Sequence, residues 1–164
     1  MADDAVKTQF FRLFGYRIFA ILAPLMALNP YKMREIVFHL LYSSDFTAEQ
    51  QEESFPILMQ HHQVTKKGMY AAKAHSEEIR GKLQEIDQMI SETAEEYEFD
   101  RIPRVERNLL RLGVYEIYFS KTVPPKVAIT EAVRLAKKFS SAESGSFINA
   151  ILDALYKKKP EAVQ

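Results

Sequence analysis

The chain of 164 residues contains no cysteine, and this absence excludes disulfide bonds, thiolate catalysis and metal sites built on sulfur. It contains only five glycines, which leave little material for tight β-turns or phosphate-binding loops. The formal net charge is zero, so the molecule as a whole exerts no long-range attraction on nucleic acid. These absences favour a helical protein whose binding properties depend on local patches.

Motifs of common enzymes are also missing. The sequence has no G-x-G-x-x-G, no G-x-x-x-x-G-K-[ST] and no H-E-x-x-H. His61 and His62 are adjacent, so on a helix they diverge by about 100° and do not both face one ion; we expect exposed or capping histidines. The sequence therefore predicts no enzyme activity, no catalytic residues, no cofactor and no metal site.

Helical periodicity is present along most of the chain. Asn29 and Pro30 form an N-cap followed by a proline at the first helical position, which predicts a helix over 30–43. Further helices are expected near 47–54, 56–63 and 103–119, whereas 66–97 is either one helix or two helices broken near Gly81. Two more follow Pro124 and Pro125, separated by a serine-rich connection: Ser140, Ser141, Ser144 and Gly145. The expected fold class is all-α.

The first 29 residues differ from the rest in being apolar and aromatic. The run from Ile18 to Leu28 contains about 11 apolar residues, too few to span a bilayer, which needs about 20. Four interpretations remain open: an extra packed helix, a true start further on at Met26 or Met33, an interfacial membrane helix, or a cleaved signal peptide.

Charge is distributed unevenly along the chain. Residues 77–100 carry nine acids and two bases, whereas residues 101–138 carry nine bases and three acids. Arg104, Arg107 and Arg111 are spaced as a basic stripe along one helix. We expect an acidic surface and a basic surface on one neutral protein, although solvated helix faces would have the same composition.

Three blocks in the C-terminal half resemble the NusB family of bacterial transcription antitermination factors. They are L-L-R-L-G-V-Y-E-I at 109–117, P-P-K-V-A-I-T-E-A-V-R-L-A-K-K-F at 124–139 and S-F-I-N-A-I-L-D at 146–153. The resemblance covers about residues 30–158. It implies two three-helix bundles packed together, here with an extra N-terminal helical segment. The expected division is an extension at 1–29, subdomains at 30–99 and 100–159, and a tail at 160–164.

The resemblance also implies a function. It predicts a cytoplasmic, non-enzymatic antitermination factor that binds boxA-type single-stranded RNA of ribosomal RNA leaders together with the ribosomal protein NusE, within the RNA polymerase antitermination complex. The implied RNA-binding residues are Lys32, Arg34, Tyr42, Arg111, Glu143 and Phe147, and the implied partner-binding residue is Glu106. The family often has other residues, bases among them, at the positions of Tyr31, Met33 and Ser146. Fewer bases mean fewer phosphate contacts, so we expect weak RNA binding by the chain alone.

Other interpretations of the same residues stay open. Arg111 is equally suited to an internal ion pair with Glu116 or a neighbour, and Tyr42 and Phe147 are equally suited to the core. An all-helical, self-associating adaptor without an RNA role would show the same periodicity, and a homodimer is possible with either function. We expect no membrane association unless the N-terminal extension provides it.

Overall fold

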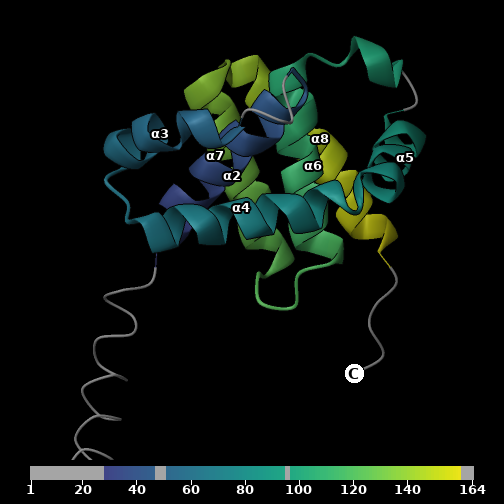
Figure 1. Cartoon of the computed structure of the whole chain (residues 1–164). Coiled ribbons are helices and arrows are strands. Elements are labelled where there is room, and N and C mark those ends of the chain that lie inside the picture. Colours follow the sequence, from purple (N-terminus) through teal and green to yellow (C-terminus); the bar gives the residue numbers. More distant parts are fainter. Residues whose placement is uncertain (1–27, 47–50, 95–96, 160–164) are drawn as a thin grey trace, which may run out of the picture.

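The computed structural model describes residues 28–46, 51–94 and 97–159, which fold into helices and contain no strand (Figure 1). In chain order the elements are α2 (Pro30–Ser44), the 3₁₀ turn η1 (Gln51–Ser54), α3 (Phe55–His62), α4 (Lys66–Arg80), α5 (Leu83–Thr93), the 3₁₀ turn η2 (Phe99–Arg101), α6 (Arg104–Tyr118), α7 (Pro125–Phe139) and α8 (Ala142–Lys158). The all-α prediction is confirmed for these residues. The predicted N-terminal helical segment and the tail at 160–164 lie outside them.

Local sequence signals explain most helix ends. The Asn29 side chain accepts a hydrogen bond from the backbone N–H of Tyr31 at 2.9 Å, which caps α2 as predicted. The stretch 66–97 forms two helices, because α4 ends at Gly81 and α5 begins after Lys82. Of the two alternatives for this stretch, the broken helix is confirmed. None of the described helices combines the length and hydrophobicity that crossing a bilayer requires.

Two predicted boundaries need correction. Ser144 and Gly145 do not connect α7 to α8 but lie inside α8, because the Ser141 hydroxyl accepts a hydrogen bond from the Ser144 N–H at 3.2 Å and starts the helix there. The predicted helix over 47–54 is only a 3₁₀ turn at 51–54 within the described residues, and positions 47–50 lie outside them.

Helix α6 lies at the centre of the molecule. It packs against α7 and α8, and also against α2 and α5. Helix α5 packs on α6 and α8. Its residues Ile86 and Ile90 are fully buried. Gly113 permits a close approach of α6 and α8, since a Cβ atom there would lie 2.6 Å from Leu152 Cδ1. Almost every face of α6 is therefore buried.

Candidate nucleic-acid interface

A buried carboxylate, Glu35, organises the basic side chains between α2 and α7. It accepts hydrogen bonds from Arg134 at 3.1 Å and from Lys138 at 2.9 Å. Burial alone would raise the pKa of Glu35, but the hydrogen bonds and charges of the two bases outweigh it and lower the pKa. The side chains of Arg134 and Lys138 remain 34% and 48% exposed. Glu35 thus fixes two cations at the surface without removing them from solvent.

His62 adjoins this carboxylate and packs against a second histidine, His39. His62 Nδ1 lies 3.7 Å from Glu35 Oε2, and its ring packs 5.5 Å from the ring of His39. Burial lowers the pKa of His39 to about 4, and repulsion from His62 adds to this effect. His61 is exposed as predicted, but His62 is buried, which corrects the expectation that both would be exposed or capping. No described group of these residue types is arranged to hold a metal ion.

Lys32 lies on the same face, near the start of α2. Burial is the main cause of the lowered pKa of His62, and the positive charge of Lys32 contributes to it. Next to Lys32, the exposed ring of Tyr31 lies 5.2 Å from the Arg134 guanidinium. Lys32 and Lys138 thus both lie close enough to His62 for their charges to lower its pKa.

Arg34 is not on that surface. It was expected to face RNA, but it is only 8% exposed, and its Nε donates hydrogen bonds to both carboxylate oxygens of Glu116 at 2.8 and 3.1 Å. A second carboxylate, Glu131, lies 3.9 Å from its NH1. Burial raises the pKa of Glu116 although Arg34 acts in the opposite direction. The guanidinium of Arg34 joins α2 to α6 and is not presented to a phosphate in this structure.

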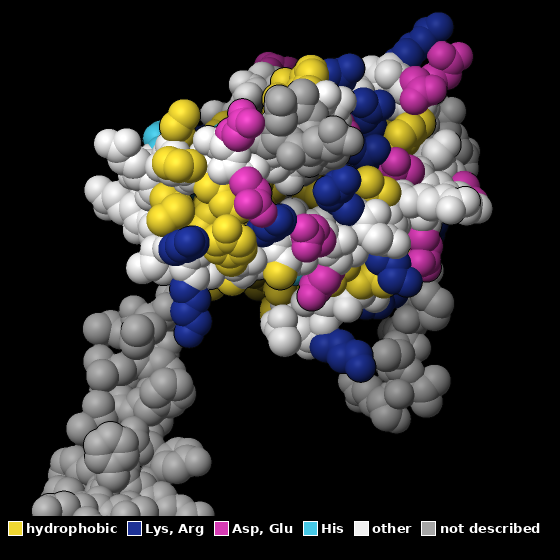
Figure 2. All heavy atoms as spheres, viewed as in Figure 1, with side chains coloured by type: hydrophobic (Ala, Val, Ile, Leu, Met, Phe, Trp, Pro, Cys, Tyr) yellow, Lys and Arg dark blue, Asp and Glu magenta, His cyan; other side chains and the backbone are white. Residues whose placement is uncertain are grey.

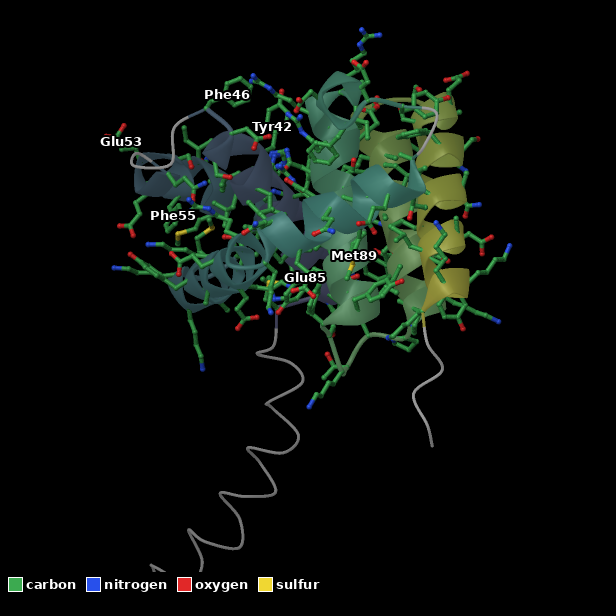
Figure 3. All side chains as sticks on the ribbon, turned by 90° about the vertical axis from the view of Figure 1, so that its right-hand side faces the viewer. Tyr42, Phe46, Glu53, Phe55, Glu85 and Met89 are labelled. Carbon is green, nitrogen blue, oxygen red and sulfur yellow. The ribbon has the colours of Figure 1, made fainter. Side chains whose placement is uncertain are left out.

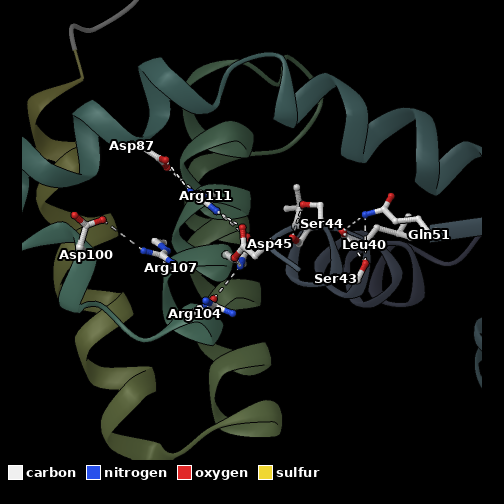
Figure 4. A network of polar contacts seen from close by, with 12 residues as sticks. Leu40, Ser43, Ser44, Asp45, Gln51, Asp87, Asp100, Arg104, Arg107 and Arg111 are labelled. Carbon is white, nitrogen blue, oxygen red and sulfur yellow. Dashed lines mark hydrogen bonds and ion pairs between the residues drawn. The ribbon is translucent and has the colours of Figure 1, made fainter. Parts of the chain in front are cut away.

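Arg111 has a similar position on α6 (Figure 4). Its Nε and NH2 donate to the two carboxylate oxygens of Asp87 at 2.8 and 2.7 Å, and its NH1 donates to Asp45 at 3.2 Å. Asn108 donates a further hydrogen bond to Asp45 at 2.7 Å. Burial would lower the pKa of Arg111, but the two aspartates raise it. We call Arg111, Asp45 and Asp87 the Arg111 clamp. The ion-pair partners of Arg111 are therefore Asp45 and Asp87, and not Glu116.

An aromatic ridge continues from the end of α2 (Figure 3). Tyr42 is half-buried between Phe38 and Phe46, whose ring centroids lie 6.1 and 5.4 Å from its own. Phe46 is 57% exposed, and the guanidinium of Arg104 lies 4.3 Å from its ring centroid. The predicted arginine stripe is therefore divided, because Arg104 is exposed whereas Arg111 is buried. Phe46 was not among the predicted RNA-binding residues, although its spacing of four residues from Tyr42 indicates neighbouring side chains.

Phe147 and Glu143 lie near the start of α8. The ring of Phe147 is half-buried and meets the 53% exposed ring of Tyr97 edge to face at 5.1 Å. Glu143 is exposed in the first turn, where its own backbone N–H and the Ser141 hydroxyl lower the pKa of its carboxyl. Neither side chain belongs wholly to the core, so both remain accessible to a ligand.

Glu106, the residue expected to bind the partner, is buried in this structure. The residue is 5% exposed, and its Oε1 accepts hydrogen bonds from the hydroxyls of Ser140 at 2.7 Å and Ser144 at 2.5 Å. Its Oε2 is also buried and has no hydrogen-bond partner in the described structure. Glu106 thus holds the α7–α8 connection against the first turn of α6.

The acidic stretch 77–100 does not form a purely acidic face. Over α4 and α5, Figure 2 shows acidic and basic side chains interspersed. Lys73 pairs with both Glu52 and Glu77, and Lys82 pairs with Glu85 at 3.5 Å. Pairing of this kind weakens the separation of charge that the sequence suggested.

Comparisons with known proteins agree with this architecture. Residues 31–157 match the model of the NusB family. The chain is 36% identical over 125 residues to the transcription antitermination protein NusB of Chlamydia pneumoniae, a match that covers 76% of this chain and 78% of that protein. It is 35% identical over 132 residues to the Clostridium perfringens protein of the same name, covering 79% of this chain and 98% of the other.

Solved structures give the same result. T. maritima NusB is similar with a TM-score of 0.66 and 32% identity, and the match covers 81% of this chain and 94% of that one. A chain from the crystal structure of the antitermination factors NusB and NusE in complex with dsRNA has a TM-score of 0.67 at 32% identity, covering 79% of this chain and 96% of that one. On sequence and fold alike, the chain belongs to the NusB family.

Proposed function

We propose that this chain is a non-enzymatic transcription antitermination factor of the cytoplasm. It binds boxA-type RNA of ribosomal RNA leaders together with the ribosomal protein NusE, and it acts within the RNA polymerase antitermination complex. The observation that carries the proposal is the family match over residues 31–157. Support comes from the relatives that are named antitermination proteins and from the similar chain in a complex of NusB and NusE with RNA.

The RNA surface in this proposal extends on both sides of the first turn of α6. This turn contacts the residue Phe46, just after α2, through Arg104, and it contacts the start of α8 through Glu106 and Ser144. Half-buried aromatic rings lie on either flank and offer faces or edges on which unpaired bases can stack. The proposed contact residues are Lys32, Tyr42, Glu143 and Phe147, extended by Phe46 and Arg104. Arg34 and Arg111 act as positioning residues that hold α2 and α5 on α6.

The first experiment separates a phosphate contact from a structural ion pair. Lys32→Ala should weaken binding of a boxA-type RNA most at low salt and lower the salt slope by about 1, because one phosphate contact is lost. Arg34→Ala should instead lower the melting temperature, since Glu116 would lose its partner. Fluorescence anisotropy over a salt series and thermal melting measure the two effects. Lys158→Ala, an exposed change in the last turn of α8, is the control.

The second experiment concerns Phe147. If a base stacks on its ring, Phe147→Ala should lose about 1–3 kcal/mol of RNA-binding free energy. Its stability loss should be below the roughly 3–5 kcal/mol expected for a fully buried phenylalanine. Phe55→Ala, at a residue that is 5% exposed, provides the buried comparison. An unchanged RNA affinity of folded Phe147→Ala would remove this residue from the interface.

The third experiment concerns NusE. In the proposal Glu106 contributes through the α7–α8 connection that it holds, and RNA and NusE bind with positive cooperativity because each extends the surface that the other meets. Glu106→Gln keeps the size of the side chain and removes its charge, so it should weaken NusE binding in calorimetric titrations without unfolding the protein. Unchanged affinity would place Glu106 outside the partner surface. Equal NusE affinity with and without RNA would contradict the cooperativity.

A further inference from the structure

A groove with a volume of about 880 Å³ opens beside the first described residue, and Tyr31, whose ring also lies next to Arg134, forms part of its lining. Its walls come from the start of α2, from α4, and from the α6–α7 connection with the first turns of α7 (Figure 1). The lining is mainly apolar and includes Leu28, Met33, Ala71, Ala74, Val123 and Val127. Val127 is 44% exposed, so part of this apolar lining is open to solvent.

The end of the N-terminal apolar run already lies in this groove. Leu28 is its last residue, packs against the core, and has side-chain atoms 3.7 and 3.8 Å from the position that a Cβ atom of Gly68 on α4 would occupy. Met26 is two residues away, which is at most about 7 Å of extended chain. The apolar residues that precede Leu28 are therefore within immediate reach of the groove.

Charge is also complementary between the groove and the segment before it. The groove contains three carboxylates, Glu78, Glu116 and Glu131, against the single guanidinium of Arg34 and the imidazole of His75. Residues 5–29 contain three bases and no acid. Glu116 and Glu131 are buried and paired with Arg34 and Arg134, so the exposed carboxylate of Glu78 is the acid that a base of the segment can approach.

We propose that residues 10–27 fold back on their own molecule and cover this groove. The aromatic and aliphatic side chains of the segment occupy the apolar lining, and Arg12 or Arg17 lies near Glu78. A groove of this size is comparable to sites of about 300–1,000 Å³ that bury drug-sized ligands, so it holds several apolar side chains. The extension thereby completes the apolar face of α2 and α4 instead of serving a membrane or a second copy.

The absence of tryptophan from the chain permits a direct test. Leu25→Trp introduces a single fluorophore in the full-length protein. We expect its emission at shorter wavelength, and its quenching by acrylamide several-fold weaker, than in a peptide of residues 8–29 with the same substitution. Both values should stay constant on dilution, and sedimentation should show that the sample is monomeric.

Groove variants make the test specific. Ala74→Glu and Val127→Glu change exposed lining positions on two different helices, so each should fold normally and return the emission toward that of the peptide. Ala150→Glu, an exposed change on α8, should leave it unchanged. Peptide-like quenching in the unsubstituted groove would overturn the proposal. Loss of the shift on dilution would assign the groove to a second copy, and a shift that appears only with vesicles of phosphatidylcholine and phosphatidylglycerol would assign the segment to membranes.

Discussion

Acidification should destabilise this protein through His39. Burial lowers the pKa of its imidazole from 6.5 to about 4, so between these values the unfolded chain binds a proton that the folded protein does not. The free energy of unfolding is unaffected by this group above pH 6.5 and falls as the pH drops from 6.5 toward 4. At about pH 5 the calculated loss is about 2 kcal/mol, which partial exposure of the ring reduces to about 1–2 kcal/mol.

Urea unfolding followed by circular dichroism at about pH 7.5 and about pH 5 measures this loss. His39→Gln removes the titrating group. A change in packing lowers the stability of the variant equally at both pH values, so it cancels when the losses on acidification are compared. The variant should therefore lose about 1–2 kcal/mol less than the wild type on acidification. Both proteins retain His62 and Glu116, so the difference between them isolates His39. Equal losses in the two proteins would refute the assignment of this pH dependence to the buried imidazole.

Three further predictions concern stability. Arg111→Ala should cost about 3 kcal/mol in urea unfolding, because two partly buried aspartates would lose their shared partner; an unchanged midpoint would contradict this. Gly113→Ala should cost about 1–3 kcal/mol, since the new methyl group would lie 2.6 Å from Leu152 Cδ1, and a melting temperature equal to that of the wild type would show that α8 moves freely. Tyr118→Phe should cost about 1 kcal/mol in the same melting assay through loss of its 2.7 Å hydrogen bond to the Leu155 carbonyl, and no loss would mean that water replaces it.

The helices were predictable because their signals are local. Asn29 caps α2 through the backbone two residues on, and α4 ends at Gly81, a residue type that disfavours continuation of a helix. Ser141 shows the limit of such signals, since several serines in one stretch qualify as caps and only the folded chain selects one. Local chemistry fixed the approximate position of each element more reliably than its first residue.

The burial of charged residues was not predictable, because it depends on partners that are distant in the sequence. Arg34 and Glu116 are 82 residues apart, and the Glu106 carboxylate meets Ser140 only after α7 has turned back toward α6. Since nearly all sides of α6 are covered, its periodicity does not distinguish an exposed acid from a buried one. The contact between Phe46 and Arg104 likewise joins residues that are distant in the sequence.

The Arg111 clamp also determines how the molecule loses its structure. One guanidinium holds the last turn of α2 and the middle of α5 to α6, so opening either contact leaves a charged group short of its hydrogen bonds. Local opening of α5 alone would therefore cost nearly as much as opening the centre of the fold. Amide hydrogens of α5, α6 and the end of α2 should exchange with solvent together, as a single cooperative unit. An ion pair that contributes little by direct attraction can in this way make two halves of a chain unfold as one.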